Sequence, residues 1–259
     1  MNQPAEGRNM KWTYENLHVE CPWCGHPNIF NRKSDLRSFD PIDCRQVSCD
    51  SPDCSRAFHV SGDMINPAYE MIIFDCDELL EKKQFMYCAL NLAQAFEVFF
   101  GHYLRVGLIY KPFWADVRAE KDIGSLKNLE KLLYKKTRRF SFTDMKNLFI
   151  CHLLYEDQPK SMLESENIIR RIPLKPSPHS NDEIKNAQMP SDKRVRQLLL
   201  VLNACGVPEL RNRVVHKLAF RPDANEVRAA LKETREILFP LAYALRVHVA
   251  DPNWYGRPK

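Results

Sequence analysis

Two cysteine pairs near the N-terminus constrain the fold of this chain more than any other feature. Cys21 and Cys24 are separated by proline and tryptophan and followed by glycine, and Cys49 and Cys54 form a second, wider pair. Short stretches of strand-like composition flank each pair. Two hairpin tips that contribute two thiolates each are typical of a tetrahedral zinc site. Residues 17–66 are therefore predicted to form a small β zinc ribbon that holds one structural zinc ion per chain.

The ligands of the second half of this site have alternatives. Cys44, Cys49 and Cys54 are spaced five residues apart, so Cys44 could replace either of the other two. His26 and His59 are further candidates, since zinc also accepts imidazole nitrogen. A metal is expected in each case, because a fragment of about 50 residues buries too little apolar surface to fold alone.

The composition favours a cytoplasmic protein. The 259-residue chain contains nine cysteines and begins with a polar segment that lacks the apolar core of a signal peptide. This combination favours reduced thiols over disulfides. No apolar run approaches the ~18 residues that span a bilayer, so no membrane association is expected. The net charge of +5 is compatible with nucleic-acid binding but does not establish it.

Beyond the cysteines, apolar residues recur at steps of three and four, which predicts amphipathic α-helices. Helices are expected over residues 77–108, 126–139, 143–155, 191–204 and 223–249. Residues 172–190 contain four prolines and are predicted to form a loop. The chain has only eight glycines, which argues against a turn-rich all-β fold. The fold class is therefore predicted as mainly α, with residues 67–250 forming one helical domain.

Arg211 and His216 carry the chemistry that the sequence suggests. Histidine can take and give a proton near neutral pH, and arginine holds a permanent planar charge that suits a phosphate. The pair would serve a reaction that moves a proton at a hydroxyl and develops negative charge on phosphorus. On one α-helix, however, five residues turn two side chains about 140° apart. A second copy of the motif, in a homodimer, is expected to complete the site.

The segment Arg211-Asn212-x3-His216 resembles the R-x4–6-H motif of the HEPN superfamily, including the small polar residue after the arginine. The helical patterns on either side extend the resemblance to about residues 70–250. It implies a HEPN-like helical bundle and a ribonuclease site built across a homodimer. In this family a polar residue on a neighbouring helix commonly supports the pair, so Glu97 is the candidate partner of Arg211. The alternative is a glutamate at the rim of its helix.

The resemblance also implies a reaction. His216 would act as general base or acid at the 2′-hydroxyl, Arg211 would stabilise charge on the phosphoryl oxygens, and Asn212 would orient substrate or fix the local turn. The expected activity is a metal-independent endoribonuclease of the toxin or defence kind, leaving 2′,3′-cyclic phosphate and 5′-hydroxyl ends. An antitoxin or activator is a possible partner. Two rival interpretations are a non-catalytic HEPN scaffold and a regulator whose zinc ribbon binds nucleic acid.

A basic cluster with interleaved aromatic residues closes the helix predicted over 126–139. It consists of Lys135, Lys136, Arg138 and Arg139. Such a cluster can hold a phosphate backbone while rings stack on bases, which indicates an RNA contact. Cations at a helix C-terminus also stabilise the helix dipole, and this second interpretation stays open.

Overall fold

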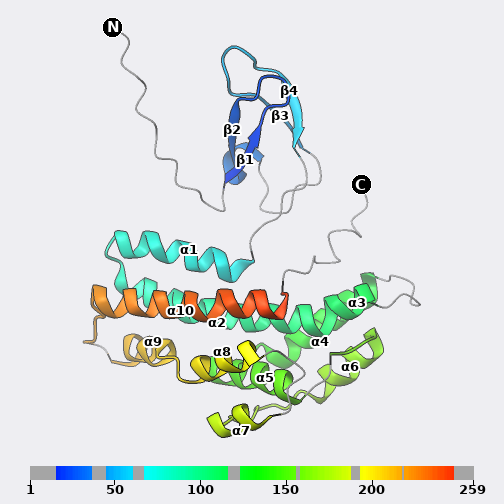
Figure 1. The fold of residues 1–259 in the computed structure, drawn as a ribbon, viewed down its shortest axis with the longest axis vertical. Helices are drawn as coiled ribbons and strands as arrows, with labels where there is room; N and C mark the ends of the chain where they lie inside the picture. The colour runs from blue at the N-terminus through cyan, green and yellow to red at the C-terminus, as the bar shows by residue number, and fades with distance from the viewer. Residues whose placement is uncertain are drawn as a thin grey trace. The chain divides into compact units, whose positions relative to one another are not determined.

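The computed structural model describes residues 16–36, 45–60, 67–115, 123–155, 158–187, 193–217 and 219–247. The chain divides into two compact units, residues 1–67 and residues 68–259. Strands occur in the described part of the first unit, and the described part of the second is helical (Figure 1). The prediction of a mainly α-helical chain is confirmed.

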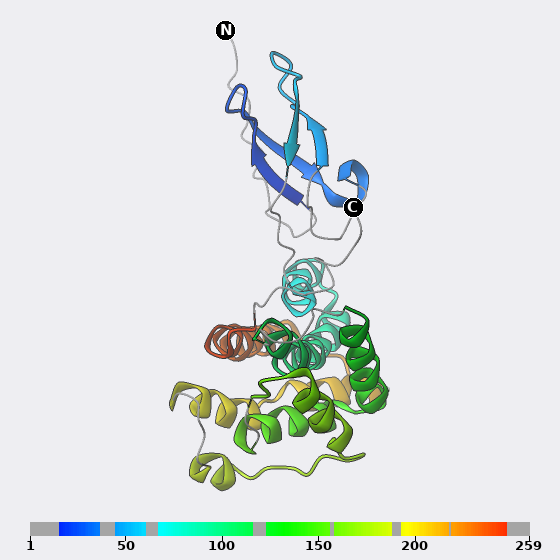
Figure 2. The same ribbon diagram turned by 90° about the vertical axis from the view of Figure 1, so that its right-hand side faces the viewer.

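The N-terminal unit contains two antiparallel hairpins, seen side-on in Figure 2. They are formed by β1 (Asn16–Glu20) with β2 (Pro27–Asn31), and by β3 (Arg45–Ser48) with β4 (Ala57–Val60). A short π-helical turn, η1 (Arg32–Leu36), follows β2. The rings of Phe30 and Phe58, one from each hairpin, lie 6.2 Å apart at the centre of a small core. This core includes Cys21 and Cys49, so the cysteine turns are part of what holds the hairpins together.

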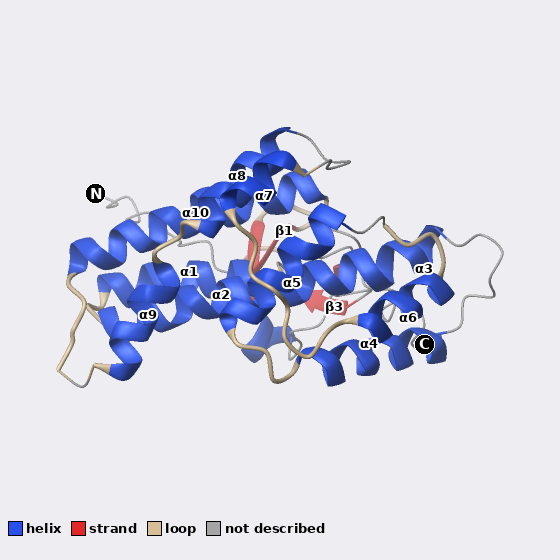
Figure 3. Cartoon of the chain, turned by 90° about the horizontal axis from the view of Figure 1, so that it is seen from below, coloured by secondary structure: helices blue, strands red, loops and turns tan. Residues whose placement is uncertain are grey.

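The helical unit is organised around one long helix, α2, which packs against α1, α5, α9 and α10 (Figure 3). Aromatic rings fill this centre: Phe99 and Phe100 on α2 contact Phe149 on α5. The elements of the unit are α1 (Ala68–Glu81), α2 (Phe85–Arg105), η2 (Val106–Tyr110), α3 (Lys111–Ala115), α4 (Ile123–Thr137), α5 (Phe142–Tyr155), α6 (Met162–Arg171), α7 (Asn181–Asn186), α8 (Lys193–Asn203), α9 (Val207–His216) and α10 (Ala224–Leu245).

The helix predicted over 77–108 is wrong as a single element. The chain reverses at residues 82–84, where Lys83 adopts a left-handed φ of 56°. Because of this turn, helix α1 packs antiparallel against α2, and the Tyr69 ring contacts the Phe99 ring. Each of the two helices buries an apolar face against the other. The spacing of apolar residues is therefore the same in both, and in the sequence it looks like the pattern of one long helix. Neither glycine nor proline marks the turn.

The predicted loop at 172–190 contains a helix, α7, and the preceding segment contains α6, which the apolar pattern did not predict. Local capping explains both. Ser180 and Glu183 form a reciprocal capping box at the start of α7, and Ser161 accepts the Glu164 amide at the start of α6. A serine followed three residues later by glutamate is the sequence signal for such a start. The last helix ends at Leu245 instead of 249, because Arg246 is left-handed.

Candidate functional site

The two cysteine turns share one backbone design. In the first, the Gly25 amide donates to the Cys21 carbonyl over 2.9 Å, and Gly25 has a φ of 71°. In the second, the Ser55 amide donates to the Ser51 carbonyl over 3.1 Å, and Ser55 has a φ of 48°. Ser51 therefore occupies the backbone place that Cys21 has in the first turn. The missing thiol comes from Cys49, two residues earlier, which explains the wider spacing of the second pair.

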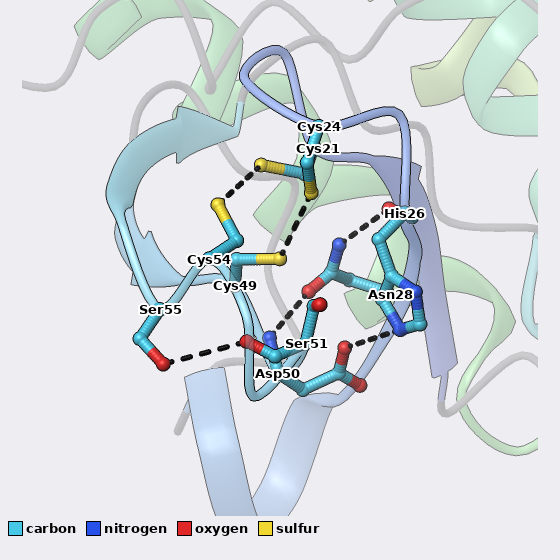
Figure 4. A network of polar contacts seen from close by, with 9 residues as sticks. All are labelled: Cys21, Cys24, His26, Asn28, Cys49, Asp50, Ser51, Cys54 and Ser55. Atoms are coloured by element: carbon cyan, nitrogen blue, oxygen red, sulfur yellow. Dashed lines mark hydrogen bonds and ion pairs between the residues drawn. The ribbon is translucent and has the colours of Figure 1, made fainter.

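The four predicted ligand sulfurs come together (Figure 4). The Sγ atoms of Cys21 and Cys54 are 3.9 Å apart, those of Cys24 and Cys49 are 3.7 Å apart, and all four lie within 4.8 Å of one another. A tetrahedral metal with bonds of ~2.3 Å to sulfur separates its ligands by about 3.75 Å. The cluster could therefore hold a metal ion. Cys44, the alternative ligand, lies outside the described residues.

The ionisation of these thiols also favours a bound cation. Burial raises the pKa of the Cys21 thiol, but hydrogen bonds from the Trp23 and Cys24 backbone bring it down to about 7. For Cys24, the His26 backbone lowers the pKa, whereas burial and the three neighbouring thiols raise it, to about 12. Adjacent thiolates repel one another, and a bound metal ion would neutralise that repulsion.

A buried asparagine braces the two turns against each other (Figure 4). The amide nitrogen of Asn28 donates to the His26 carbonyl over 2.7 Å, and its oxygen accepts the Asp50 amide over 2.8 Å. Nε2 of His26 lies 2.9 Å from the Asp50 carboxylate. His26 thus pairs with Asp50, and it is outside the sulfur cluster, as is the exposed His59. The sequence analysis did not identify Asn28. The signal that could have identified it is a polar asparagine within a strand that lies between the two cysteine pairs.

The second candidate site lies on α9. Gly206 precedes this helix and Pro208 occupies its first turn, a position that suits proline because its missing amide is not needed there. Its buried residues include Leu210 and Val214, and the helix packs on α2. Arg211 is half-exposed, and His216, the last helical residue, is exposed.

Arg211 contacts the adjacent Asn212 and lies near Glu97, its predicted partner. Its Nη1 donates to Oδ1 of the adjacent Asn212 over 3.1 Å. On α2, burial raises the pKa of the half-buried Glu97, and the positive charge of Arg211 counteracts that rise. The structure therefore brings Glu97, Arg211 and Asn212 into one neighbourhood. His216 lies five residues along, about 7.5 Å further up the helix and about 140° around it. Within one chain, His216 and Arg211 leave the helix in different directions.

The basic cluster lies at the C-terminal end of α4, and its four residues differ in their contacts and exposure. The ammonium of Lys136 donates to the carbonyls of Arg170 and Ile172, over 2.8 and 3.4 Å, at the end of α6. Lys135, Arg138 and Arg139 are exposed. Helices α4 and α9 lie toward opposite ends of the helical unit (Figures 1 and 3). The cluster and the α9 residues therefore lie on helices that are separate in the fold.

Comparison with protein-family models, with curated proteins and with solved structures found no match. Among the helices that the structure describes, none combines the length and the apolar character needed to cross a membrane.

Proposed function

We propose that this protein is a metal-independent endoribonuclease with a HEPN-like helical domain, and that α9 carries its catalytic residues. The observation that carries the proposal is the neighbourhood of Arg211. This arginine is held on a packed helix beside Asn212 and a half-buried glutamate, with an exposed histidine on the same helix. A permanent cation and a proton-transfer group are the two functions that cleavage of a phosphodiester by its own 2′-hydroxyl requires.

Each residue has a separate role in this proposal. His216 removes the proton from the 2′-hydroxyl or delivers one to the leaving 5′-oxygen. Arg211 stabilises the charge on the phosphoryl oxygens, and Glu97 keeps the guanidinium in place. Asn212 orients the substrate or Arg211. The products are RNA ends with a 2′,3′-cyclic phosphate and a 5′-hydroxyl.

The active form in this proposal is a homodimer. The two catalytic side chains of one α9 diverge, and a second α9 facing the first would place two arginines and two histidines in one cleft. Val215, beside His216, leaves 44% of its surface exposed and would be covered in such a dimer. Light scattering should give a dimer at micromolar concentration, and a strictly monomeric active enzyme would refute this arrangement.

The cysteine cluster fits a structural zinc ion, since four thiolates in a tetrahedron are a closed site with no position for substrate. The reaction needs no second metal. Lys135, Arg138 and Arg139 would contact RNA away from the site of cleavage. Reduced thiols suit a cytoplasmic location, and a toxin or defence role would require an antitoxin or activator.

The decisive experiment uses an RNA with one 2′-deoxy nucleotide at the cleavage position. The proposed reaction needs that hydroxyl, so cleavage should disappear at that linkage and persist elsewhere. His216→Ala should abolish cleavage, and Arg211→Lys should impair it, because a point charge does not replace a planar fork. A brief magnesium-chelator treatment should leave the rate unchanged. Cleavage of the deoxy linkage at the normal rate would rule out the mechanism.

One observation favours a second candidate function, nucleic-acid binding by the N-terminal unit. Trp23 leaves 59% of its surface exposed, its indole nitrogen is anchored to the Ala57 carbonyl over 3.1 Å, and the Arg56 guanidinium lies 5.7 Å from its ring. A fixed ring beside a cation can stack on a base. Trp23→Ala would then weaken RNA binding, and unchanged binding would remove this candidate.

A further inference from the structure

Arg213 lies within the α9 motif, two residues after Arg211 and three before His216, and the proposed reaction gives it no role. Its side chain is nevertheless held from two sides. Nη1 donates to Oε1 of Glu226 over 3.1 Å, and the guanidinium carbon lies 4.5 Å from the centre of the Phe220 ring. Nε is buried and no described residue accepts a hydrogen bond from it. The guanidinium of Arg213 is therefore held by an ion pair with Glu226 and by a cation–π contact with Phe220.

Both of these partners belong to the segment that follows His216. Phe220 closes a turn, in which its amide donates to the Lys217 carbonyl over 2.8 Å. Glu226 is the third residue of α10, where its Oε2 accepts the Asp223 amide in a capping box. One carboxylate thus binds Arg213 with one oxygen and the start of α10 with the other.

Arg213 also supports the end of α9 through its backbone. The Lys217 amide donates to the Arg213 carbonyl over 3.0 Å, which is the last helical hydrogen bond of α9. His216 is the final residue of the helix, and terminal turns fray when nothing ties them down. Arg211, in contrast, lies a turn earlier, next to α2. The two catalytic residues of the proposed function are therefore held by different contacts.

We propose that Arg213 is a positioning residue that fixes His216, by tying the last turn of α9 to the Phe220 turn and to the start of α10. This inference rests on the proposed function for its effect on catalysis, but the clamp itself can be tested without activity. It assigns Arg213 no contact with substrate.

The structural arm measures hydrogen–deuterium exchange in Arg213→Ala. The Lys217 and Phe220 amides should exchange roughly tenfold faster than in the wild type, because local opening becomes easier. The matched control is Arg235→Ala, which removes another arginine–carboxylate pair between helices, Arg235 with Asp77, and should leave both amides unchanged. Unaltered exchange at Lys217 and Phe220 in Arg213→Ala would overturn the clamp.

The kinetic arm separates positioning from direct contact with RNA. Arg213→Ala should lower kcat by about tenfold to a hundredfold with little change in KM, because a small displacement of a catalytic group costs that much. Phe220→Leu and Glu226→Gln should cause the same type of defect, although neither residue faces the substrate in this proposal. Glutamine preserves an acceptor for the Asp223 amide. Arg213→Ala combined with Glu226→Gln should be no worse than Arg213→Ala alone.

A defect in Arg213→Ala that Phe220→Leu and Glu226→Gln do not share would overturn the inference, since Arg213 would then act on the substrate itself. A wild-type protein that cleaves no RNA would refute the proposed function. In that case the exchange measurement would still decide whether Arg213 holds the end of α9.

Discussion

Glu97 lies in a half-buried position on α2, where an ionised carboxylate loses part of its hydration. Burial raises its pKa above the ordinary value, and the nearby Arg211 charge offsets only part of that rise. The balance matters for function, because the carboxylate that is costly to bury is also the group proposed to hold the catalytic arginine. Such residues commonly trade stability for activity.

Glu97→Gln should therefore make the protein more stable at neutral pH. A raised folded-state pKa means that the folded protein binds this proton more tightly than the unfolded chain, so the wild type gains stability as pH falls. The advantage of the glutamine variant should be full above the raised pKa and disappear below the ordinary value of 4.5. Denaturant unfolding across this pH range tests it. A less stable Glu97→Gln at neutral pH would show that attraction to Arg211 outweighs burial.

Gly25→Ala should weaken the N-terminal unit by conformational strain alone. Gly25 has a φ of 71°, and a Cβ built there meets no atom within 4 Å. The left-handed backbone costs a non-glycine residue about 1–2 kcal/mol. The loss should appear as faster metal transfer to a chelator. Ser55→Gly is the opposite control, because Ser55 already has a positive φ, so it should retain its metal at least as well. Equal behaviour of the two variants would contradict this account.

At the scale of elements, basic residues at the end of α4 have two different roles: one stabilises the fold, and the others are exposed to solvent. Lys136 donates to carbonyls at the end of α6, where a cation satisfies unpaired acceptors and the helix dipole. Its neighbours Lys135, Arg138 and Arg139 are exposed. The position of each basic residue at the end of α4 therefore decides its role. Lys136 stabilises the fold, and the exposed residues are available to a ligand.

Replacing Lys135, Arg138 and Arg139 together with alanine should weaken RNA binding without unfolding the protein. If each neutralises one phosphate, the slope of log affinity against log salt should fall by about 2 in magnitude for single-stranded RNA. Lys136→Ala is the matched control: it should cost about 1 kcal/mol of stability and leave the salt slope nearly unchanged. A triple variant with a wild-type slope would remove the RNA contact from the end of α4.

At the scale of the whole molecule, the two units have separate cores. The apolar cluster that contains Cys21 and Cys49 shares no residue with the cluster of the helical unit. The first cluster is small, so we expect its stability to depend on a metal ion held by the four cysteines, whereas the second is large enough to be stable by itself.

Removing the proposed zinc ion should therefore unfold the N-terminal unit and leave the helical unit folded. A strong zinc chelator under reducing conditions, or Cys21→Ser with Cys24→Ser, should abolish ordered signals from the N-terminal unit, including that of the anchored Trp23 indole. The helical far-UV signal should stay close to that of the wild type, and metal analysis should fall from one ion per chain to none. Parallel loss of the helical signal would show that the cores depend on each other.

The sequence alone determined those features that local pattern encodes. The spacing of apolar residues predicted the helical class, the flanking stretches of each cysteine pair predicted the hairpins, and glycine with proline marked the start of α9. The Ser180–Glu183 pair encoded a helix as well, but the prolines around it hid that signal. The turn at Lys83 could not be predicted, because a lysine in the left-handed region carries no mark in the sequence.

Only the tertiary structure decided which distant residues meet. The sulfurs of Cys54 and Cys49, from the second turn, lie beside those of Cys21 and Cys24, from the first. Asn28 joins the cysteine turns, Glu97 on α2 lies near Arg211 on α9, and Arg213 is held between Phe220 and Glu226. Helices α4 and α9 lie toward opposite ends of the helical unit, although the basic cluster and the Arg211–His216 motif are equally evident in the sequence. These outcomes depend on how helices and hairpins pack, and packing energy is shared among residues that no local pattern connects.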